Sequence, residues 1–221
     1  MFDVLNMFEN ISFHCRKSSR YGAGLSAAKP INVMRDLEEG KIKSADKKQL
    51  ECSEKILNDF FTQAYADVKE VFYKTKTDND MIEYKLFVNK MIGGKIRTVS
   101  FDNESSGTQR VLEIIRSLLG AFCGVTVVYD EIDDGIHDIL LTNILMSMVD
   151  DITGQLIITT HNTLILEKID IKSVYIINID YKGNKEVRCL DEFPRIQETN
   201  NPRIMYLKGL FGGVPIFDYI D

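Results

Sequence analysis

Two short runs of apolar, mostly β-branched residues flank a stretch with helical periodicity. The runs 125–129 and 156–160 each predict a strand buried on both faces. Strand, crossover helix and strand form a βαβ unit, so we expect the two strands to be parallel and their carboxyl ends to share one sheet edge. Between them, residues 137–149 carry the apolar face of the helix: Leu140, Leu141, Ile144, Leu145, Met148 and Val149.

Polar residues follow both predicted strands at that edge. Asp130 and Glu131 come directly after the first strand, and His161 comes after the second. Open α/β sheets bind ligands outside the carboxyl ends of their strands. Asp130 can hold hydrated Mg²⁺, Glu131 can polarise an attacking water, and His161 can hold or sense a γ-phosphate. The trio suits metal-assisted hydrolysis of a nucleoside triphosphate. The competing interpretation is that these side chains only cap the following loops.

A third polar segment precedes an amphipathic helix predicted over residues 105–122. It reads Ser105-Ser106-Gly107-Thr108-Gln109. Small and hydroxyl-bearing residues at a helix N-terminus offer backbone N–H groups and hydroxyls, which together with the helix dipole make an anion site. A simple N-cap explains the same residues without any ligand. The apolar face of this helix is Val111, Leu112, Ile115, Leu118, Leu119 and Phe122.

Taken together, these motifs resemble a known family. The resemblance lies in four motifs in order: SSGTQ, VVYDEID, a histidine at position 137, and QLIITTHN. With these motifs the chain resembles the ABC-class AAA ATPases of bacterial abortive-infection, retron-associated and related phage-defence systems. Their ATPase core is similar to that of the SMC and DNA-repair ABC ATPases. The resemblance extends from residue 101 to the tail MYLKGLFGGVP at 205–215. It implies an α/β P-loop NTPase fold with a mainly parallel sheet flanked by helices.

The resemblance also implies roles for individual residues. Ser106 and Gly107, with Thr108 and Gln109, match the signature motif, which binds the γ-phosphate of a nucleotide held by the opposite subunit. Thr108 departs from the transporter pattern, which has a second glycine there. Asp130 matches the Walker B metal aspartate and Glu131 the catalytic glutamate. Asp133 to His137 match the D-loop region, and His161 the switch histidine. The implied cofactors are Mg²⁺ and ATP as substrate.

One family motif is missing from the sequence. No G-x-x-x-x-G-K-[ST] phosphate loop, the Walker A motif, occurs in the chain. Two glycine-containing segments come near this motif but do not match it. After Gly22-Ala23-Gly24 comes Lys29-Pro30, where proline lacks the backbone N–H that a phosphate loop needs. The second segment, Gly93-Gly94-Lys95, predicts a hairpin turn. We therefore expect the C-terminal part of an ATPase, from a split gene, a truncated gene or a selected portion. We expect either a homodimer or a partner chain that supplies the Walker A lobe.

Two alternatives stay open. The first is a non-enzymatic, degenerate ATPase fragment that dimerises or regulates an effector. The second is an unrelated metal-dependent hydrolase that uses Asp130, Asp133, Asp134 and His137. The intact Glu131 and His161 favour the ATPase, whereas the missing phosphate loop favours the first alternative.

The remaining pattern predicts a helical N-terminal segment over 1–65, followed by the ATPase-like portion over 66–221. A short helix is predicted within 1–13 and a longer one from Asp46, with Asp46 and Gln49 as a capping box. Residues 66–102 predict an antiparallel hairpin, with a polar turn at 75–80 and a second turn at Gly93-Gly94. The predicted unit 125–161 contains the two strands and the histidine. In 173–221 we expect strands and a last helix, with 173–179 as a third neighbouring, mainly parallel strand.

Composition narrows the class of protein. The formal net charge of −6 over 221 residues argues against a broadly basic, nucleic-acid-coating surface but leaves a local patch possible. The four cysteines are widely spaced, which predicts neither a zinc site nor a disulfide framework and favours a reducing cytoplasm. No signal peptide or membrane span is predicted.

Overall fold

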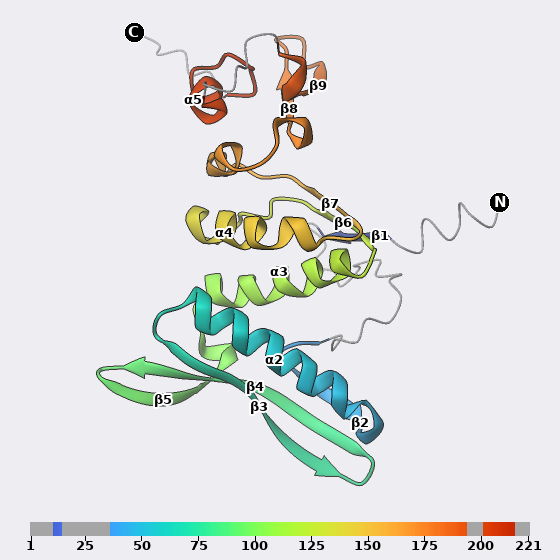
Figure 1. Ribbon diagram of the computed structural model, residues 1–221, viewed down its shortest axis with the longest axis vertical. Helices are drawn as coiled ribbons and strands as arrows, with labels where there is room; N and C mark the ends of the chain where they lie inside the picture. The colour runs from blue at the N-terminus through green and yellow to red at the C-terminus, as the bar shows by residue number, and fades with distance from the viewer. Residues whose placement is uncertain (1–10, 15–35, 194–200, 215–221) are drawn as a thin grey trace, which may run out of the picture.

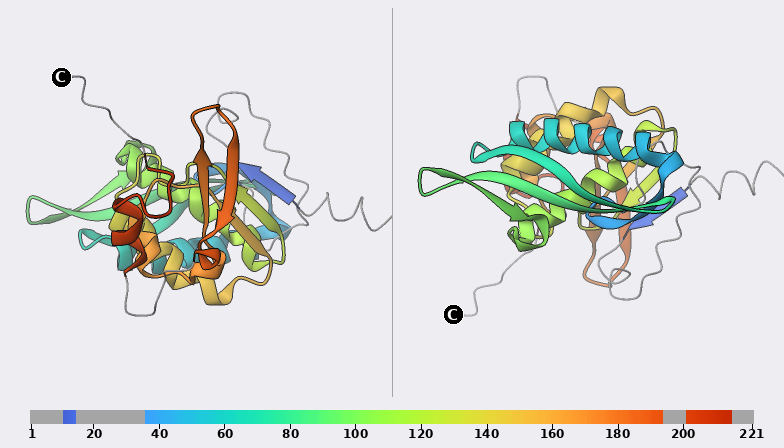
Figure 2. Two further views of the ribbon diagram at one scale, coloured as in Figure 1. Left: turned by 90° about the horizontal axis from the view of Figure 1, so that it is seen from above. Right: turned by 90° about the horizontal axis from the view of Figure 1, so that it is seen from below.

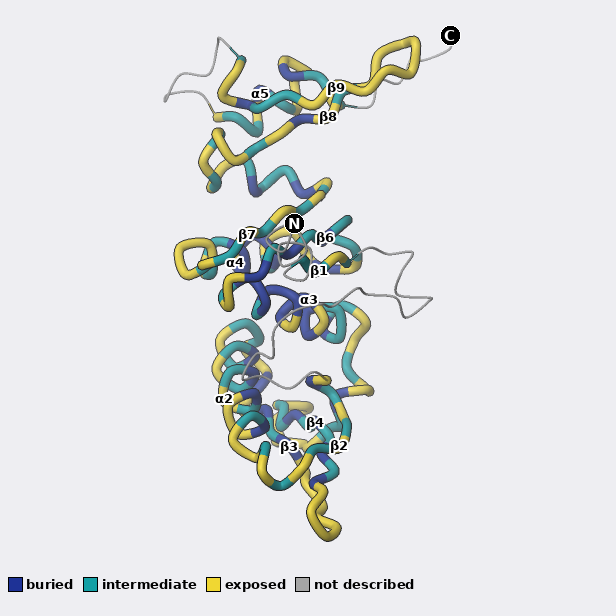
Figure 3. Tube along the Cα trace, turned by 90° about the vertical axis from the view of Figure 1, so that its right-hand side faces the viewer, coloured by how far each residue is buried: buried dark blue, intermediate teal, exposed yellow. Residues whose placement is uncertain are grey.

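The elements stack in layers along one axis. The structure, a computed structural model, describes residues 11–14, 36–193 and 201–214. Figure 1 shows the antiparallel strands β3, β4 and β5 at one end, then α2, then α3 and α4, then the parallel strands, with the C-terminal unit at the other end. Figure 3 shows that buried residues concentrate along α3, in the middle of the stack. The sequence around Gly22 and Gly24 lies outside the described residues.

The predicted βαβ unit is confirmed in its topology, but its second strand is not buried on both faces as expected, because Ile157 is 45% exposed. β6 (Thr126–Tyr129) and β7 (Gln155–Ile158) pair in parallel, and α4 (Asp138–Met148) is the crossover between them. A third parallel strand, β1 (Ile11–His14), pairs with the other side of β6, which gives the order β1-β6-β7. The short helix predicted within 1–13 is therefore wrong at residues 11–13. Apolar side chains there alternate with polar ones, which suits a strand as well as a helix.

The prediction that residues 173–179 form a third strand beside β6 and β7 is also wrong. Among the described residues, β8 (Tyr175–Ile179) pairs with β9 (Lys185–Cys189) alone, antiparallel, in a separate two-stranded sheet. The local reason is the tight turn between them, where the Asp180 carboxylate accepts N–H groups of Lys182 and Asn184, each at 2.8 Å. Two short 3₁₀ turns, Thr163–Glu167 and Ile171–Ser173, precede β8 in place of a full crossover helix.

The C-terminal unit has a small core of its own. The helix α5 (Pro202–Leu207) packs there, and its N-cap Asn201 accepts the Ile204 N–H. β8, the 3₁₀ turn Leu190–Glu192, α5 and the segment after α5 contribute to this core. Its buried apolar residues are Ile176, Leu190, Met205 and Phe211.

The antiparallel sheet follows the predicted hairpin but is larger. β3 (Val68–Asp78) and β4 (Met81–Ile92) pair over nearly their whole length, and β5 (Lys95–Ser100) pairs with β4. Gly93 and Gly94 have φ of 59° and 74°, as a two-residue hairpin turn requires. The polar turn predicted at 75–80 is too long, because the strand continues to Asp78. Only Asn79 and Asp80 remain for the turn.

The predicted N-terminal helical segment includes a strand. β2 (Glu39–Lys43) pairs with β4, and α2 (Lys47–Ala64) follows it through a 3₁₀ turn, Ser44–Asp46. Asp46 makes no side-chain cap hydrogen bond, so the predicted capping box is absent. The 3₁₀ turn holds the Asp46 backbone at φ −93° and ψ 9°, away from the extended conformation of an N-cap residue.

Side chains of α2 complete the hydrogen bonding of β3. The Asn58 side-chain oxygen accepts the Val71 N–H at 3.0 Å, and Glu54 Oε2 accepts the Tyr73 N–H at 2.6 Å. These bonds hold α2 against the sheet, as Figure 2 shows from below. The helix thereby covers backbone donors that would otherwise lie at an open strand edge.

α3 (Ser106–Phe122) joins the two halves of the main core. Phe101, which is fully buried just before α3, contacts Phe61 of α2 edge to face, with ring centroids 5.3 Å apart. Ile114 of α3 and Ile132, after β6, are also fully buried in this core. The N-terminus of α3 is thus fixed from both sides by apolar packing.

We expect Phe101→Ala to lower the free energy of unfolding by about 3–5 kcal/mol, because it removes a fully buried ring from this core. Urea unfolding followed by circular dichroism measures the change. Ile96→Ala is the control, since Ile96 is 61% exposed and its removal should change the value by about 0.5 kcal/mol or less. Equal losses in the two variants would contradict this view of the core.

Candidate functional site

The carboxyl ends of β6 and β7 are linked through one threonine. The Thr159 hydroxyl donates to Asp130 Oδ1 at 2.5 Å and accepts the Glu131 N–H at 2.8 Å. The main chain adds two bonds, Thr159 N–H to the Tyr129 carbonyl at 3.0 Å and Ile132 N–H to the Thr159 carbonyl at 3.1 Å. The acidic loop after β6 is therefore held against the end of β7. Sequence patterns did not single out Thr159, whose role depends on pairing between strands.

Glu131 adopts an unusual backbone conformation. Its φ is +53°, in the left-handed region that non-glycine residues rarely occupy. Such a residue costs on the order of 1–3 kcal/mol and is found more often at functional sites than elsewhere. The Asp134 N–H donates to the Glu131 carbonyl at 3.2 Å, which closes a tight turn.

His161 lies beside the loop that follows β6. Its backbone N–H donates to both carboxylate oxygens of Asp133, at 3.1 and 3.3 Å. The next residue, Asn162, is only 4% exposed and donates from its side chain to the Asp138 carbonyl and the Thr142 hydroxyl. These bonds fix the backbone around His161 to the start of α4. Asn162 was not predicted, although it directly follows His161 in the sequence.

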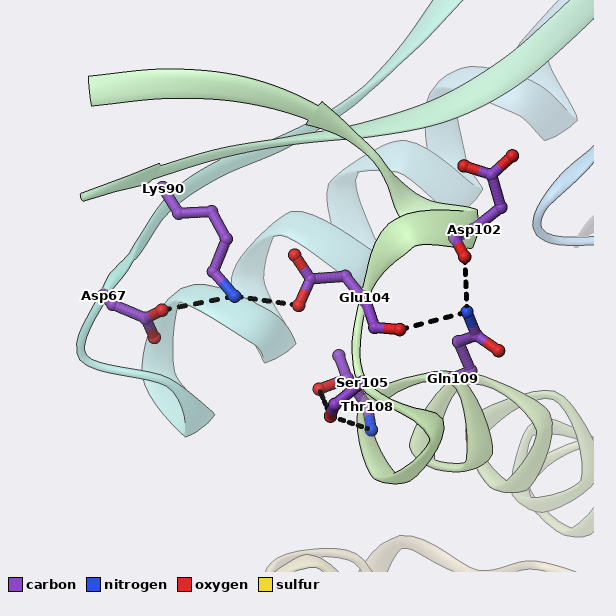
Figure 4. Close-up of polar contacts among 7 residues, drawn as sticks. All are labelled: Asp67, Lys90, Asp102, Glu104, Ser105, Thr108 and Gln109. Carbon is purple, nitrogen blue, oxygen red and sulfur yellow. Dashed lines mark hydrogen bonds and ion pairs between the residues drawn. The ribbon is translucent and has the colours of Figure 1, made fainter. Parts of the chain in front are cut away.

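The first turn of α3 is tightly organised. Ser105 is the N-cap, and its hydroxyl accepts the Thr108 N–H at 3.2 Å and lies 2.9 Å from the Thr108 hydroxyl. The Gln109 side chain donates to the Asp102 and Glu104 carbonyls at 2.7 and 3.2 Å, as Figure 4 shows. Thr108 is 8% exposed, so its side chain and that of Gln109 serve the loop itself. Ser106 is exposed at the first position of the helix.

Gly107 brings the predicted signature segment against the loop after β6. A Cβ atom on Gly107 would lie 2.9 Å from the Gly135 carbonyl oxygen, which is closer than real Cβ contacts come. Gly135 itself has φ of +76°. His137, two residues later, caps α4, because its Nδ1 accepts the Ile139 N–H at 3.3 Å. The structure thus joins two motifs that are well separated in sequence.

Arg110 lies close to this edge. The Arg110 guanidinium pairs with Glu113 at 2.6 Å and lies 5.4 Å from the centroid of the Tyr129 ring. Burial lowers the pKa of Arg110, but Glu113, Tyr129 and Asp134 outweigh it, so the net shift is upward. Burial raises the pKa of Tyr129 to about 12.

His14 ends β1 beside Asp130. Its carbonyl accepts the Asp130 N–H at 2.8 Å, and its ring stacks on Tyr129 with centroids 5.4 Å apart. Burial, followed by the charges of Arg116 and Arg110, lowers the pKa of the His14 imidazole. A neutral ring is therefore favoured at this position. Neither His14 nor Arg110 was identified from the sequence.

The donor set at the sheet edge fits a magnesium ion bound mainly through water. Asp130 and Thr159 offer hard oxygen atoms, and Mg²⁺ typically takes one or two protein oxygens, with waters and phosphates completing its shell. Among the residues that the structure describes, no group of three or more His, Cys, Asp or Glu side chains is arranged to hold a metal ion. The alternative of a metal-dependent hydrolase built on Asp130, Asp133, Asp134 and His137 has no support in this part of the chain.

Comparison with protein families is decisive for classification. The model of the family described as "AAA domain, putative AbiEii toxin, Type IV TA system" matches residues 29–167, which is more than half of the chain. The chain belongs to this AAA-domain family. The match includes the signature segment, the acidic loop and His161. Membership places the protein in the general class of AAA-type ATPases.

Solved structures support the fold of this AAA-domain protein. Among 23 matching chains, one comes from work described as "Structural biochemistry of ATP-driven dimerization and DNA stimulated activation of SMC ATPases". It aligns with a TM-score of 0.50 and 12% sequence identity, covering 77% of this chain and 98% of that one. At this identity the likeness concerns the fold alone, and it confirms the predicted α/β P-loop NTPase type. No curated protein sequence matches the chain.

The described helices give no indication of a membrane span. None of them is both long enough and apolar enough to cross a bilayer.

We expect Gly107→Ala to destabilise the protein by about 1–3 kcal/mol, because the added methyl meets a backbone carbonyl. The sign of this change is informative, because replacing glycine by alanine within a helix normally stabilises the protein by about 0.5–1 kcal/mol. Ser106→Ala, at the exposed neighbouring position, should change the stability by about 0.5 kcal/mol or less. Thermal or urea unfolding compares the variants. A more stable Gly107→Ala protein would show that the two loops do not touch.

Proposed function

We propose that this chain is the signature and Walker B portion of an ATPase that hydrolyses Mg-ATP at a subunit interface. The Thr159 bridge between Asp130 and Glu131 carries the proposal. It fixes a carboxylate, a strained glutamate and the segment ending in His161 at one edge of a parallel sheet. Ligands of α/β proteins bind at such an edge.

Each side chain has a part in the proposed reaction. Asp130 would hold a hydrated Mg²⁺, which would supply neutralisation of phosphate charge. Glu131 accepts a proton from the attacking water as its oxygen bonds to the γ-phosphorus. The bond from the γ-phosphorus to the bridging oxygen then breaks, which releases ADP and inorganic phosphate. His161 contacts the γ-phosphate, and Asp133 holds the His161 backbone in place.

A second lobe would make the remaining phosphate contacts. This partner lobe, with a lysine-containing Walker A loop, would bind the nucleotide, and Ser106 and Gly107 would approach it from a facing subunit. Gln109 and Thr108 shape this segment through their bonds to the loop. The ATP-driven dimerisation named for the structurally similar SMC ATPases supports a dimer. The facing subunit would be another copy of the chain, whereas the Walker A lobe would come from a different polypeptide, because the present sequence lacks that motif.

The family description supports a proposal for the biological setting. A family described by an AbiEii toxin and a type IV toxin–antitoxin system supports a role in cytoplasmic phage defence by abortive infection. The ATPase would then control an effector protein that is a separate chain or region. The net charge of −6 gives no support to general nucleic-acid coating.

One observation favours a second candidate function. The sequence contains no phosphate-loop motif. Without one, the chain would act as a non-enzymatic dimerisation or regulatory module that retains the ATPase fold. ATP hydrolysis by a reconstituted complex separates the two functions.

In a complex reconstituted with a Walker A lobe, we expect Glu131→Gln to slow turnover by roughly 10²-fold or more. The substitution removes the base and keeps the size and hydrogen bonding of the side chain, so nucleotide binding should persist. Phosphate release and nucleotide affinity are the measurements. The exposed Glu186→Gln in β9 is a matched control with unchanged turnover expected. Wild-type turnover in the Glu131 variant would remove Glu131 from the mechanism.

The chain alone should bind Mg-ATP with a dissociation constant in the millimolar range or weaker, about −4 kcal/mol or less favourable. Asp130 and Glu131 repel the phosphates, and the lysine and N–H cradle of a Walker A loop are absent from the sequence. Isothermal titration measures this affinity, and adding the Walker A lobe should tighten it. Micromolar binding by the chain alone would reveal a phosphate site of another kind.

A further inference from the structure

Glu104 lies immediately before the N-cap residue of α3, and its side chain is almost wholly buried. The Glu104 side chain is 5% exposed and that of Lys90 is 19% exposed. Lys90 Nζ lies 2.8 Å from Glu104 Oε2 and 3.2 Å from Asp67 Oδ2. Figure 4 shows the lysine reaching from β4 to both carboxylates. The three charges come from a strand, the α2–β3 corner and the loop before α3.

Stability alone is a weak reason for such a pair. The cost of removing two charges from water offsets much of their attraction, whereas loss of one partner leaves a buried charge unpaired. Burial lowers the pKa of Lys90, but hydrogen bonds to Glu104 and Asp67 outweigh it and raise the pKa overall. The ammonium therefore stays charged. What the pair contributes is a fixed position for Glu104.

The backbone of Glu104 is fixed by other contacts. Its N–H donates to the Phe101 carbonyl at 2.9 Å, and its carbonyl accepts from the Gln109 side chain at 3.2 Å. Ser105, the next residue, organises the first turn through Thr108. These bonds tie the Glu104 backbone to the segment 105–109, and the side chain of the same residue adds the link to Lys90.

At the other end of the pair, Lys90 lies where a projecting hairpin joins the body. The Met91 N–H, next to Lys90, donates to the Asp67 carbonyl at 2.8 Å. Beyond it the hairpin of β4 and β5 projects outward, as Figure 2 shows. Its exposed apolar side chains are Met91, Ile92 and Ile96.

We infer that Lys90 and Glu104 are positioning residues that hold the signature segment 105–109 in place relative to the β4–β5 hairpin. A force or partner that shifts the hairpin moves the segment through this pair. The inference rests on the proposed function, in which this segment faces a nucleotide on the opposite subunit. It adds a route by which an event on the antiparallel sheet reaches that nucleotide.

The first test uses the isolated chain and needs no nucleotide. Amide hydrogen exchange is measured for Glu104→Gln and Lys90→Met. The Thr108 and Gln109 amides, which are hydrogen-bonded to Ser105, should exchange at least about tenfold faster, with β3 and α4 unchanged. Lys90→Arg, which keeps the charge, should restore most of the protection.

A matched control is available in the same sheet. Lys85 pairs with Asp102 at 2.9 Å and reaches the same loop, but the two side chains are 37% and 45% exposed. Exposed pairs of this kind contribute little, so Lys85→Met should leave Thr108 and Gln109 protected. Unchanged exchange in both test variants, or faster exchange throughout the chain, would overturn the positioning role.

The second test uses the complex reconstituted with a Walker A lobe. Glu104→Gln should lower kcat by at least about tenfold and leave KM for ATP within about twofold, because the lobe holds the nucleotide. If the wild-type complex hydrolyses no ATP, the proposed function fails and hydrogen exchange still decides the positioning role. If the variant turns over at the wild-type rate, the positioning role fails and the proposed function stands.

Discussion

The burial of α3 on two sides is the constraint on which the rest of the structure depends. Val111, Ile114, Ile115 and Leu118 are at most 2% exposed, because α2 and the antiparallel sheet cover one side of the helix and β6 with α4 covers the other. A helix packed in this way cannot slide or rotate without opening a cavity. Its N-terminal turn, its contact with Gly135 and the ion pair before it therefore have defined places. The geometry of this turn therefore depends on packing along the whole length of the helix.

The fold was predictable where neighbours in sequence are also neighbours in space. The strand runs and the helical period between them predicted β6, α4 and β7, and Gly93-Gly94 predicted the β4–β5 turn. The third parallel strand was not predictable, because four residues, Ile11–His14, carry little signal and their partner β6 is distant in sequence. β8 was assigned to the wrong sheet, since its apolar run is the same whether its neighbour is parallel or antiparallel.

The candidate site was also predictable only in part. That the ends of β6 and β7 lie together followed from the handedness of a βαβ unit, whereas the bonds that organise them did not. Thr159 and Asn162 act through hydrogen bonds to residues 20 or more positions away, and such pairings leave no periodic trace in a sequence. The predicted roles of Ser106, Glu131 and His161 remain predictions. For Thr108 and Gln109, internal hydrogen bonds supply a structural reason for the residue type.

The left-handed backbone of Glu131 has a consequence for how this protein could change. Glycine at that position would relieve the strain and, by that measure alone, favour the folded state. Glutamate at position 131 therefore lowers local stability and at the same time provides a carboxylate at the sheet edge. Selection for thermal stability alone would tend to replace the glutamate, whereas selection for chemistry would retain it. Position 131 is thus a place where a stabilised variant of this chain would be expected to lose whatever activity the site has.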